Sequence, residues 1–304
     1  MNITLRQFEV LVTVADTGSF TVAAEQLGVS QPSVSETIRR IETELGFPVF
    51  HRTTRRLTAS HDGTHVIASA RELIRTMQFT YDTILARMGG ETSRISLAAL
   101  PSLISSILAP ALSTFGKSHA KVAVEVHDSN QERALALVSD GIADMAFVSQ
   151  GSLRHDLTFE TLAADRFFLL CPADHPLAGR SQVCWADLAK ERFIALTPTS
   201  SVRKVTDAAF LQANALCVPH YELEQVPSVA AMVQARLGVA ALPEYSFSMF
   251  PRDHMVAVPL VAPEMVRRIG VVTRRNRPLA PSALAFIDQC RKGVARAGLQ
   301  EPRR

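Results

Sequence analysis

The stretch "SFTVAAEQLGVSQPSVSETIRRIE", residues 19–42, predicts two short helices that are joined by a tight turn. Apolar residues recur at helical spacing on both sides of the break, namely Ala23, Ala24 and Leu27 before it and Val34, Ile38 and Ile41 after it. Gly28 supplies the positive φ that a tight turn needs, Ser30 can cap the second helix, and Pro32 suits its first turn. The pattern is typical of a helix-turn-helix, and a helical hairpin inside a larger all-α core is the alternative.

The second of these helices carries a polar face that suits contact with DNA. Its candidate DNA-contacting residues are Ser30, Gln31, Pro32, Ser33, Ser35, Glu36, Arg39 and Arg40. Just downstream, "FHRTTRRLTASH" at residues 50–61 adds Arg52, Arg55 and Arg56 and contains no acidic residue. A solvated surface loop would explain these arginines by themselves. Directly after a helix-turn-helix, they favour a β-turn wing that enters the neighbouring minor groove.

The length and composition of the chain bound its class. A chain of 304 residues exceeds one comfortable hydrophobic core and predicts two or three folding units. Its 47% hydrophobic and 20% charged residues are typical of a soluble globular protein, and a net charge of +3 is too small to argue for nucleic acid by itself. Glu9 and Asp16 interrupt the opening apolar residues, and no uncharged apolar run could span a bilayer. We therefore expect a cytoplasmic protein with no membrane partner.

Residues 62–90 predict one long helix that ends at Gly89 and Gly90. Its apolar residues repeat at alternating spacings of three and four, and they are Ile67, Ala70, Ile74, Met77, Tyr81, Ile84 and Met88. A lone amphipathic helix of this kind would pack on the core of its own chain. Between a DNA-binding unit and a second domain, the heptad seam favours dimerisation.

From Arg94 onward, strand-like and helix-like segments alternate, which predicts an α/β fold. The strand-like segments are "RISLAAL" (94–100), "KVAVEVHD" (121–128), "ADMAFVS" (143–149), "DRFFLLCPADHPL" (165–177), "RFIALT" (192–197), "PHYELEQV" (219–226), "GVAALPE" (238–244) and "RRIGVVTRR" (267–275). Segments 102–116 and 130–140 predict helices, and a closing helix near 281–296 returns toward the first set. We expect two lobes with a cleft between them, because the chain crosses from one set to the other and back.

Residues 5–60 resemble the DNA-binding domain of the LysR-type transcriptional regulators. The resemblance rests on "LRQFEVLVTVADTGSFTVAAEQLGVSQPSVSETIRRIETELGFPVFHRTTRRLTAS", which matches the family pattern almost position for position. It implies a winged helix-turn-helix over residues 1–60 that places Gln31, Pro32 and Ser35 against the major groove of double-stranded DNA and Arg55 in the minor groove. It also implies a linker helix, residues 61–90, through which two copies pair.

Two positions depart from the family pattern. Glu36 stands where the family most often has Arg, and "LTASHDG" at residues 57–63 replaces the usual L-T-x-A-G. The carboxylate of Glu36 would accept a hydrogen bond from cytosine N4 but would repel phosphate, so the base preference at this position is open.

The remaining residues, 91–304, resemble the LysR-type effector domain more loosely, with "VSDGIADMAFV" (138–148) and "LGVAALPEY" (237–245) as the clearest matches. The resemblance implies the two-lobed α/β fold of type 2 periplasmic binding proteins, with lobe I at about 91–163 and 267–304 and lobe II at about 164–266. It further implies that the effector domains pair again to give a homotetramer, a dimer of dimers. The family's role in transcription leaves RNA polymerase open as a partner.

In an open α/β cleft, a ligand is expected beyond the strand ends, near helix N-termini that favour an anion. The candidate effector-binding residues are Ser102, Ser149, Thr199, Ser200, Ser201 and Arg203. Each hydroxyl alone is explained as a helix cap, and Arg203 as a brace within its helix. Facing one another across a cleft, as the resemblance implies, they predict a site for a small organic anion, above all a carboxylate.

An enzyme is the alternative class of protein, and the sequence offers little support for one. It contains no G-x-S-x-G, P-loop, G-x-G-x-x-G or H-E-x-x-H motif. Cys171, Cys184, Cys217 and Cys290 are scattered without zinc or disulfide spacing, and the histidines are dispersed. We expect no catalytic residues, metal or cofactor; consumption of a bound ligand would instead favour the enzyme.

Overall fold

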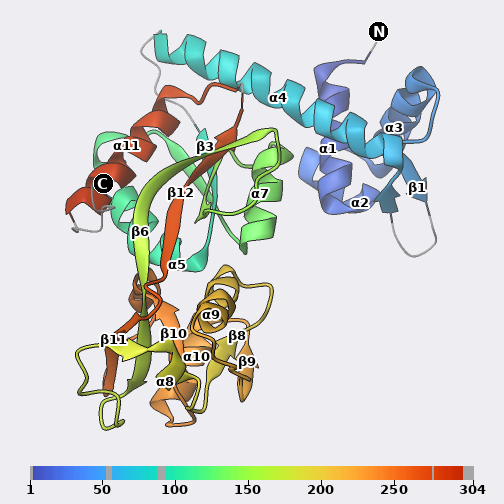
Figure 1. Cartoon of the computed structure of the whole chain (residues 1–304). Helices are drawn as coiled ribbons and strands as arrows, with labels where there is room; N and C mark the ends of the chain where they lie inside the picture. Colours follow the sequence, from blue (N-terminus) through green and yellow to red (C-terminus); the bar gives the residue numbers. More distant parts are fainter. Residues whose placement is uncertain (1–2, 53–56, 88–93, 276, 297–304) are drawn as a thin grey trace. The chain divides into compact units, whose positions relative to one another are not determined.

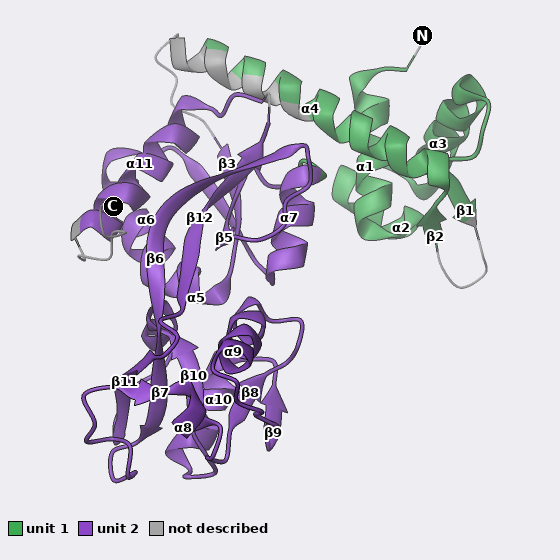
Figure 2. Cartoon of the chain, in the orientation of Figure 1, with its two compact units in different colours: residues 1–93, 140–142 green, residues 94–139, 143–304 purple. Residues whose placement is uncertain are grey.

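A computed structural model describes residues 3–52, 57–87, 94–275 and 277–296. The chain divides into two compact units, residues 1–93 with 140–142 and residues 94–139 with 143–304 (Figure 2). Across the described residues, no helix combines the length and the apolar character that crossing a membrane would need. Arg55, Arg56 and Met88, which the sequence proposed as site residues, lie outside the described residues, as does the side chain of Arg52.

The first unit begins with three helices, α1 (Leu5–Thr17), α2 (Phe20–Leu27) and α3 (Gln31–Leu45) (Figure 1). Their N-caps are Thr4, Ser19 and Ser30, and the residues that end them are Gly18, Gly28 and Gly46. Gly28 has a φ of 66°, which an L side chain adopts only with strain. The side chain of Ser30 accepts a hydrogen bond from the backbone N–H of Ser33. The predicted helix-turn-helix is therefore confirmed, and its turn follows from these local contacts.

A two-stranded wing follows the third helix. Strands β1 (Phe50–Arg52) and β2 (Leu57–Ala59) pair antiparallel. The Oε1 atom of Glu42, on α3, accepts hydrogen bonds from the backbone N–H groups of Val49 (2.9 Å) and Phe50 (3.1 Å). One carboxylate thereby fixes the start of the wing to the helix before it.

The long helix α4 (His61–Arg87) packs its first half on this unit. Ile67 is 7% exposed and Ala70 is 1% exposed, and both belong to the core formed with α1, α2, α3 and β1. Ile74 packs against the edge of the same core. The prediction that Ile67 and Ala70 form a seam between copies is therefore wrong, because the apolar face of α1 already covers them. Met77, Tyr81 and Ile84, further along the helix, are exposed.

The second unit is built on an eight-stranded mixed sheet with the order β4-β3-β5-β12-β6-β11-β7, in which β10 also pairs with β6. Its strands are β3 (Arg94–Ala99), β4 (Ala123–Asp128), β5 (Met145–Ser149), β6 (Leu157–Pro172), β7 (Val183–Cys184), β10 (Ala240–Pro243), β11 (Met255–Val261) and β12 (Val266–Arg274). Two short parallel strands, β8 (Ile194–Leu196) and β9 (Tyr221–Leu223), form a separate sheet. The predicted α/β fold is confirmed.

The helices of this unit lie in the connections between strands. A continuous helical segment after β3 consists of α5 (Pro101–Leu103), the π-helical turn η1 (Ile104–Leu108) and α6 (Ala109–Ser118). The others are α7 (Gln131–Ser139), α8 (Trp185–Leu188), α9 (Ser201–Gln212), α10 (Val226–Gln234), the 3₁₀ helix η2 (Glu244–Met249) and α11 (Pro281–Arg296).

Strand β6 passes through both lobes of this unit. Its residues 157–166 pair with β12 in lobe I, and its residues 167–172 pair with β10 and β11 in lobe II. The sequence predicted a strand from residue 165 only, because the polar residues of 157–164 hide the alternation. The chain returns to lobe I between β11 and β12, so β6 and the connection 262–265 are the two crossings (Figure 1).

Each lobe has an aromatic core. In lobe I, Phe286 of α11 packs edge-on against Phe115 and Phe147, at ring-centroid distances of 5.4 and 6.1 Å, which brings the closing helix back to the first lobe. In lobe II, Phe210 packs against both Trp185 and Phe193 at 5.3 Å. The cleft therefore lies between two separately packed bodies.

Candidate nucleic-acid interface and ligand cleft

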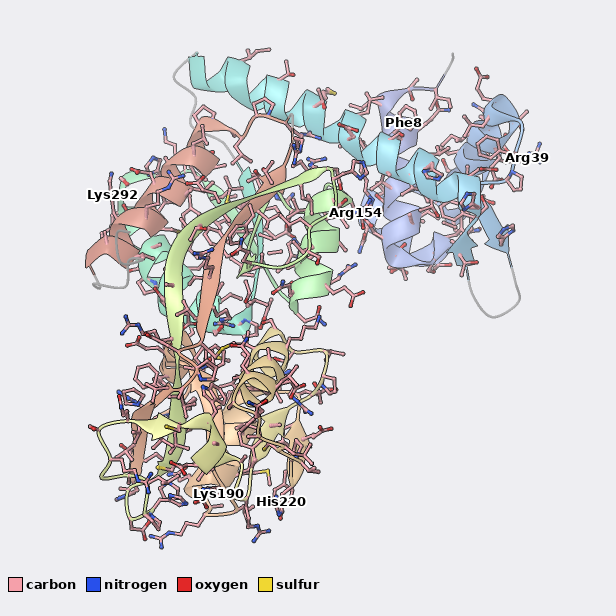
Figure 3. All side chains as sticks on the ribbon, viewed as in Figure 1. Phe8, Arg39, Arg154, Lys190, His220 and Lys292 are labelled. Carbon is pink, nitrogen blue, oxygen red and sulfur yellow. The ribbon has the colours of Figure 1, made fainter. Side chains whose placement is uncertain are left out.

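Helix α3 presents a polar face to solvent. Its apolar residues Val34, Ile38 and Ile41 are fully buried in the core of the first unit. The predicted DNA-contacting residues Ser30, Gln31, Pro32, Ser33, Glu36, Arg39 and Arg40 are exposed, and Ser35 is half-buried. Arg39 is a labelled example of an exposed side chain on this helix (Figure 3). The helical period thus gives one buried face and one face that is free to contact a ligand.

Glu36 forms ion pairs with both arginines of this face. Its carboxylate lies 3.3 Å from the Nε atom of Arg40 and 3.8 Å from that of Arg39. Exposed pairs of this kind contribute at most about 1 kcal/mol. Arg39 and Arg40 can therefore leave Glu36 for phosphate oxygens at little cost.

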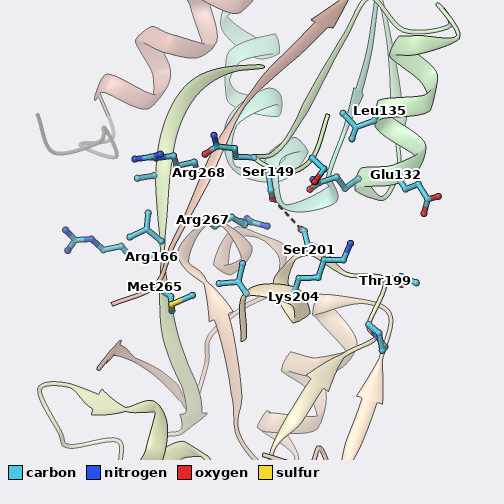
Figure 4. A pocket seen from close by; sticks show the side chains of 18 of the residues that line it. Glu132, Leu135, Ser149, Arg166, Thr199, Ser201, Lys204, Met265, Arg267 and Arg268 are labelled. Carbon is cyan, nitrogen blue, oxygen red and sulfur yellow. Dashed lines mark hydrogen bonds between the residues drawn. The ribbon is translucent and has the colours of Figure 1, made fainter. Parts of the chain in front are cut away.

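The second unit contains two adjoining cavities between its lobes. We call the smaller one, of about 420 Å³, the inner cavity, and the larger one, of about 1510 Å³, the outer cavity. They share Gln131, Thr199, Ser201 and Arg267. Ser149 of lobe I donates a hydrogen bond to Ser201 of lobe II at 3.4 Å, which spans the cleft (Figure 4).

The inner cavity is built from four junctions at which a strand gives way to a helix. These junctions are Leu100–Ser102, Asp128–Gln131, Leu196–Val202 and Glu224–Val226. Each junction points the start of a helix at the cavity, and the free N–H groups of α7, α9 and α10 favour negative charge there. The helix N-termini, taken without the charged side chains of the lining, therefore favour an anion in this cavity.

The structure brings together five of the six predicted effector-binding residues. Ser102, Thr199, Ser200 and Ser201 line the inner cavity, and Ser149 lines the outer one. Ser102 and Ser149 are 6% and 3% exposed, so their hydroxyls are withdrawn from bulk water. Ser200 also caps α9, because its Oγ accepts a hydrogen bond from the N–H of Val202 at 3.2 Å.

Arg203 does not belong to the site. Its guanidinium pairs with Asp207 (2.7 Å) and Glu222 (2.6 Å) and donates to the carbonyl of Leu196, so it braces α9 against β8 and β9. It lines neither cavity. Of the two alternatives for Arg203, these contacts favour the brace, because two acidic neighbours, one of them 19 residues away, accept its hydrogen bonds.

Arg267 is the buried cation of the cleft, and it was not among the site residues that the sequence predicted. Arg267 is 4% exposed and lines both cavities, and its Nε and Nη2 atoms donate to Oδ2 of Asp165 at 3.2 and 2.6 Å. Asp165 is fully buried, and its Oδ1 accepts from the N–H of Tyr245. The Nη1 atom of Arg267 makes no hydrogen bond with the described residues. A sequence signal existed, because Asp165 and Arg267 each lie at the start of a charged pair that leads into an apolar run, FFLL and IGVV.

The cysteines are poorly suited to act as nucleophiles. Burial raises the pKa of Cys171 and of Cys217 to about 11 and that of Cys290 to about 12. These three side chains are therefore thiols at neutral pH, and the thiolate is the reactive form. Among the residues that the structure describes, no group of three or more His, Cys, Asp or Glu side chains is arranged to hold a metal ion.

Family models match both units. The model of the bacterial regulatory helix-turn-helix proteins of the lysR family matches residues 5–64, and the model of the LysR substrate binding domain matches residues 88–295. The chain belongs to the LysR family of bacterial transcriptional regulators. It is a DNA-binding regulator with a substrate-binding domain, in a family of regulators and not of enzymes.

Other proteins are similar to this LysR-family chain over nearly its whole length. The "Uncharacterized HTH-type transcriptional regulator YbhD" of Escherichia coli is 26% identical over 283 residues, which covers 93% of this chain and 89% of that protein. The solved structure of a full-length OxyR variant from Pseudomonas aeruginosa has a TM-score of 0.78 at 20% identity, covering 97% of this chain and 95% of that one. Full-length CbnR, solved in complex with its target DNA, has a TM-score of 0.67 at 18% identity and covers 96% and 100%. These structures therefore share the fold of this chain over nearly its whole length.

Proposed function

We propose that this LysR-family regulator reads a promoter sequence through α3 and its wing, and that a small organic anion, a carboxylate, controls it from the cleft. The observation that supports an anionic effector is the buried guanidinium of Arg267. It lines both cavities, and its Nη1 atom makes no hydrogen bond with the described residues. A carboxylate withdrawn from water needs several charge-assisted hydrogen bonds. Arg267, the hydroxyls of Ser102 and Ser201 and the N-terminus of α9 can supply them.

Residues of α3 and of the wing have different roles in the proposed contact with DNA. Gln31 and Ser35 of α3 read base edges. Arg39 of α3 and the arginines Arg52 and Arg55 of the wing region bind the DNA backbone or enter the minor groove. The solved complex of CbnR with its target DNA supports DNA binding by this fold.

The DNA proposal is tested by measuring affinity for an operator and for random duplex at several salt concentrations. Arg39→Ala should weaken binding to both and reduce the salt slope by about one. Gln31→Ala should relax discrimination by about 1 to 3 kcal/mol. Arg154→Ala, an exposed arginine of the other unit, is the control. Equal losses from Arg39→Ala and Gln31→Ala on both duplexes would contradict the division of roles.

The effector proposal is tested by a thermal-shift screen of carboxylates and their neutral isosteres on the full-length protein. The acids should stabilise wild type, and Ser102→Ala and Ser201→Ala should lose most of that shift, while the exposed Ser181→Ala should keep it. Equal stabilisation by the neutral isosteres would contradict an anion site. A stabilising compound should be recovered unchanged, because the ligand acts by binding and not by turnover.

We also propose self-association and a route from ligand to DNA. The exposed apolar side chains of α4, Leu73, Met77, Tyr81 and Ile84, form a stripe that suits pairing of two copies. Leu211, Leu216 and Val218 are exposed on lobe II and support a second pairing into a tetramer.

A ligand that favours one arrangement of the lobes would change the spacing of the DNA-binding units. That change would in turn alter the contact with RNA polymerase in the cytoplasm.

A further inference from the structure

Two carboxylates line the inner cavity without partners. Asp128 ends strand β4 in lobe I, and Glu224 follows β9 in lobe II. In the described part of the chain, neither side chain forms an ion pair or a hydrogen bond. By contrast, Glu222, two residues before Glu224, is paired with Arg203. Both side chains are exposed, and they place negative charge on both lobes of a cavity that the helix N-termini would otherwise suit for an anion.

The charges of the inner cavity disfavour a simple anion. Its ionisable lining consists of Asp128, Glu224 and Arg267, and the charge of Arg267 is already balanced by the buried Asp165. A ligand that carried only a carboxylate would meet one hydrogen-bonding guanidinium and two unpaired negative charges. A ligand that also carried a positive charge would neutralise those acids.

Buried polar atoms in the same wall lack partners as well. Ser246 is fully buried, and its Oγ finds no hydrogen bond among the described residues. The Oε1 atom of Gln131, an acceptor, is buried and equally without a partner in the described chain. Both residues line the inner cavity. Native proteins rarely leave such atoms unsatisfied, so a polar group from outside the chain, a water molecule or a ligand, is expected to meet them.

The outer cavity carries the opposite sign. Arg166, Lys204 and Arg268 line it together with Arg267, against two acids, Glu132 and Glu264. Arg267 stands at the boundary of the two cavities and lies beside Ser149 and Ser201 (Figure 4). The cleft thus becomes more positive from the inner cavity outward, with Arg267 at the change of sign.

We propose that the effector is a zwitterion of the amino-acid type, whose ammonium group is held in the inner cavity by Asp128, Glu224 and the amide oxygen of Gln131. Its carboxylate lies at Arg267 and the hydroxyl of Ser201. This inference rests on the proposed function, because it specifies the charge of the same ligand. A cavity of about 420 Å³ is large enough for such a small molecule.

The experiment compares three matched series of ligands by isothermal titration calorimetry on the full-length protein. They are the standard amino acids, the carboxylic acids that lack only the α-amino group, and the amines that lack only the carboxylate. At least one amino acid should bind, with an affinity about tenfold or more above that of either analogue, because each loses charge-assisted hydrogen bonds.

Charge-neutralising variants test the assigned residues. Asp128→Asn and Glu224→Gln should each lower the affinity for the amino acid about tenfold. The double variant should gain affinity for the acid that lacks the amino group. That gain separates the assignment from a general loss of folding. Asp253→Asn, at an exposed acid that lines neither cavity, is the matched control and should bind as wild type does.

The outcomes separate this inference from the proposed function. If the acids without an amino group bind as well as the amino acids, or if the double variant behaves as wild type does, the zwitterion is overturned and the carboxylate effector stands. If no amino acid and no deamino acid binds, the zwitterion is overturned, and the carboxylate effector is then decided by the thermal-shift screen.

Discussion

At the scale of single residues, Arg267 both lines the cleft and forms a buried ion pair with Asp165. Both side chains are almost completely buried, since Arg267 is 4% and Asp165 is 0% exposed. Asp165→Asn would leave the guanidinium without its countercharge, and removing one partner of a buried pair costs about 3 to 5 kcal/mol. We expect a loss of this size in the free energy of unfolding, measured by urea denaturation.

The control for this prediction is a surface ion pair made by Arg166, the residue that follows Asp165. Arg166 and Glu264 lie 3.6 Å apart, and their side chains are 60% and 62% exposed. Glu264→Gln should therefore cost less than about 1 kcal/mol. If Asp165→Asn cost no more than this control, the buried pair would contribute no special stability.

The reactivity of Cys217 gives a second prediction at this scale. Burial raises its pKa to about 11, so the thiolate fraction at neutral pH is far below that of a free thiol with a pKa near about 8.5. Alkylation by iodoacetamide, followed by mass spectrometry, should be slow at neutral pH and should still be accelerating above the pKa of a free thiol. N-acetylcysteine in the same reaction serves as the reference, and a plateau of the Cys217 rate at the same pH as the reference would contradict the prediction.

At the scale of elements, the start of α4 depends on a close approach to the wing. A Cβ atom on Gly63 would lie 2.1 Å from the carbonyl oxygen of Val49 and 2.8 Å from Oγ of Ser60. Gly63→Ala should therefore destabilise the protein by about 1 to 3 kcal/mol, because backbone must move to make room. Gly116→Ala, in α6, is the control, because nothing lies within 4 Å of the position of its Cβ; it should stabilise the protein by about 0.5 to 1 kcal/mol. Thermal unfolding of the two variants and of wild type measures both effects.

At the scale of the whole molecule, the second half of α4 offers a surface for pairing. Leu73, Met77, Tyr81 and Ile84 are between 47% and 55% exposed. Ile84→Glu would place charge within that stripe and should shift the native mass toward a smaller species in sedimentation analysis. Operator affinity should fall as well, because two linked DNA readers gain a high effective concentration.

The matched control for pairing is Ala68→Glu, an exposed position of the same helix that lies outside the stripe. It should keep both the native mass and the operator affinity. If Ile84→Glu also kept both, the stripe would not be an interface between copies.

The sequence by itself determined the features that depend on neighbouring residues. The turn between α2 and α3 follows from Gly28 and from the cap of Ser30, whose partners lie within a few residues. Strand and helix starts that carry Ser102, Ser200 and Ser201 were predictable for the same reason, since the switch from strand to helix is a local pattern. Contacts within one turn or one strand end do not depend on how distant segments pack.

Only the tertiary structure decided which faces meet and which charges are paired. The heptad pattern shows that α4 has an apolar face, but only packing shows that α1 covers Ile67 and Ala70 while Tyr81 and Ile84 stay open. Arg267 and Asp165 are 102 residues apart, and Glu222 reaches Arg203 only because β9 lies beside β8. The physical reason is that burial and ion pairing arise from approach in space, which local spacing along the chain does not encode.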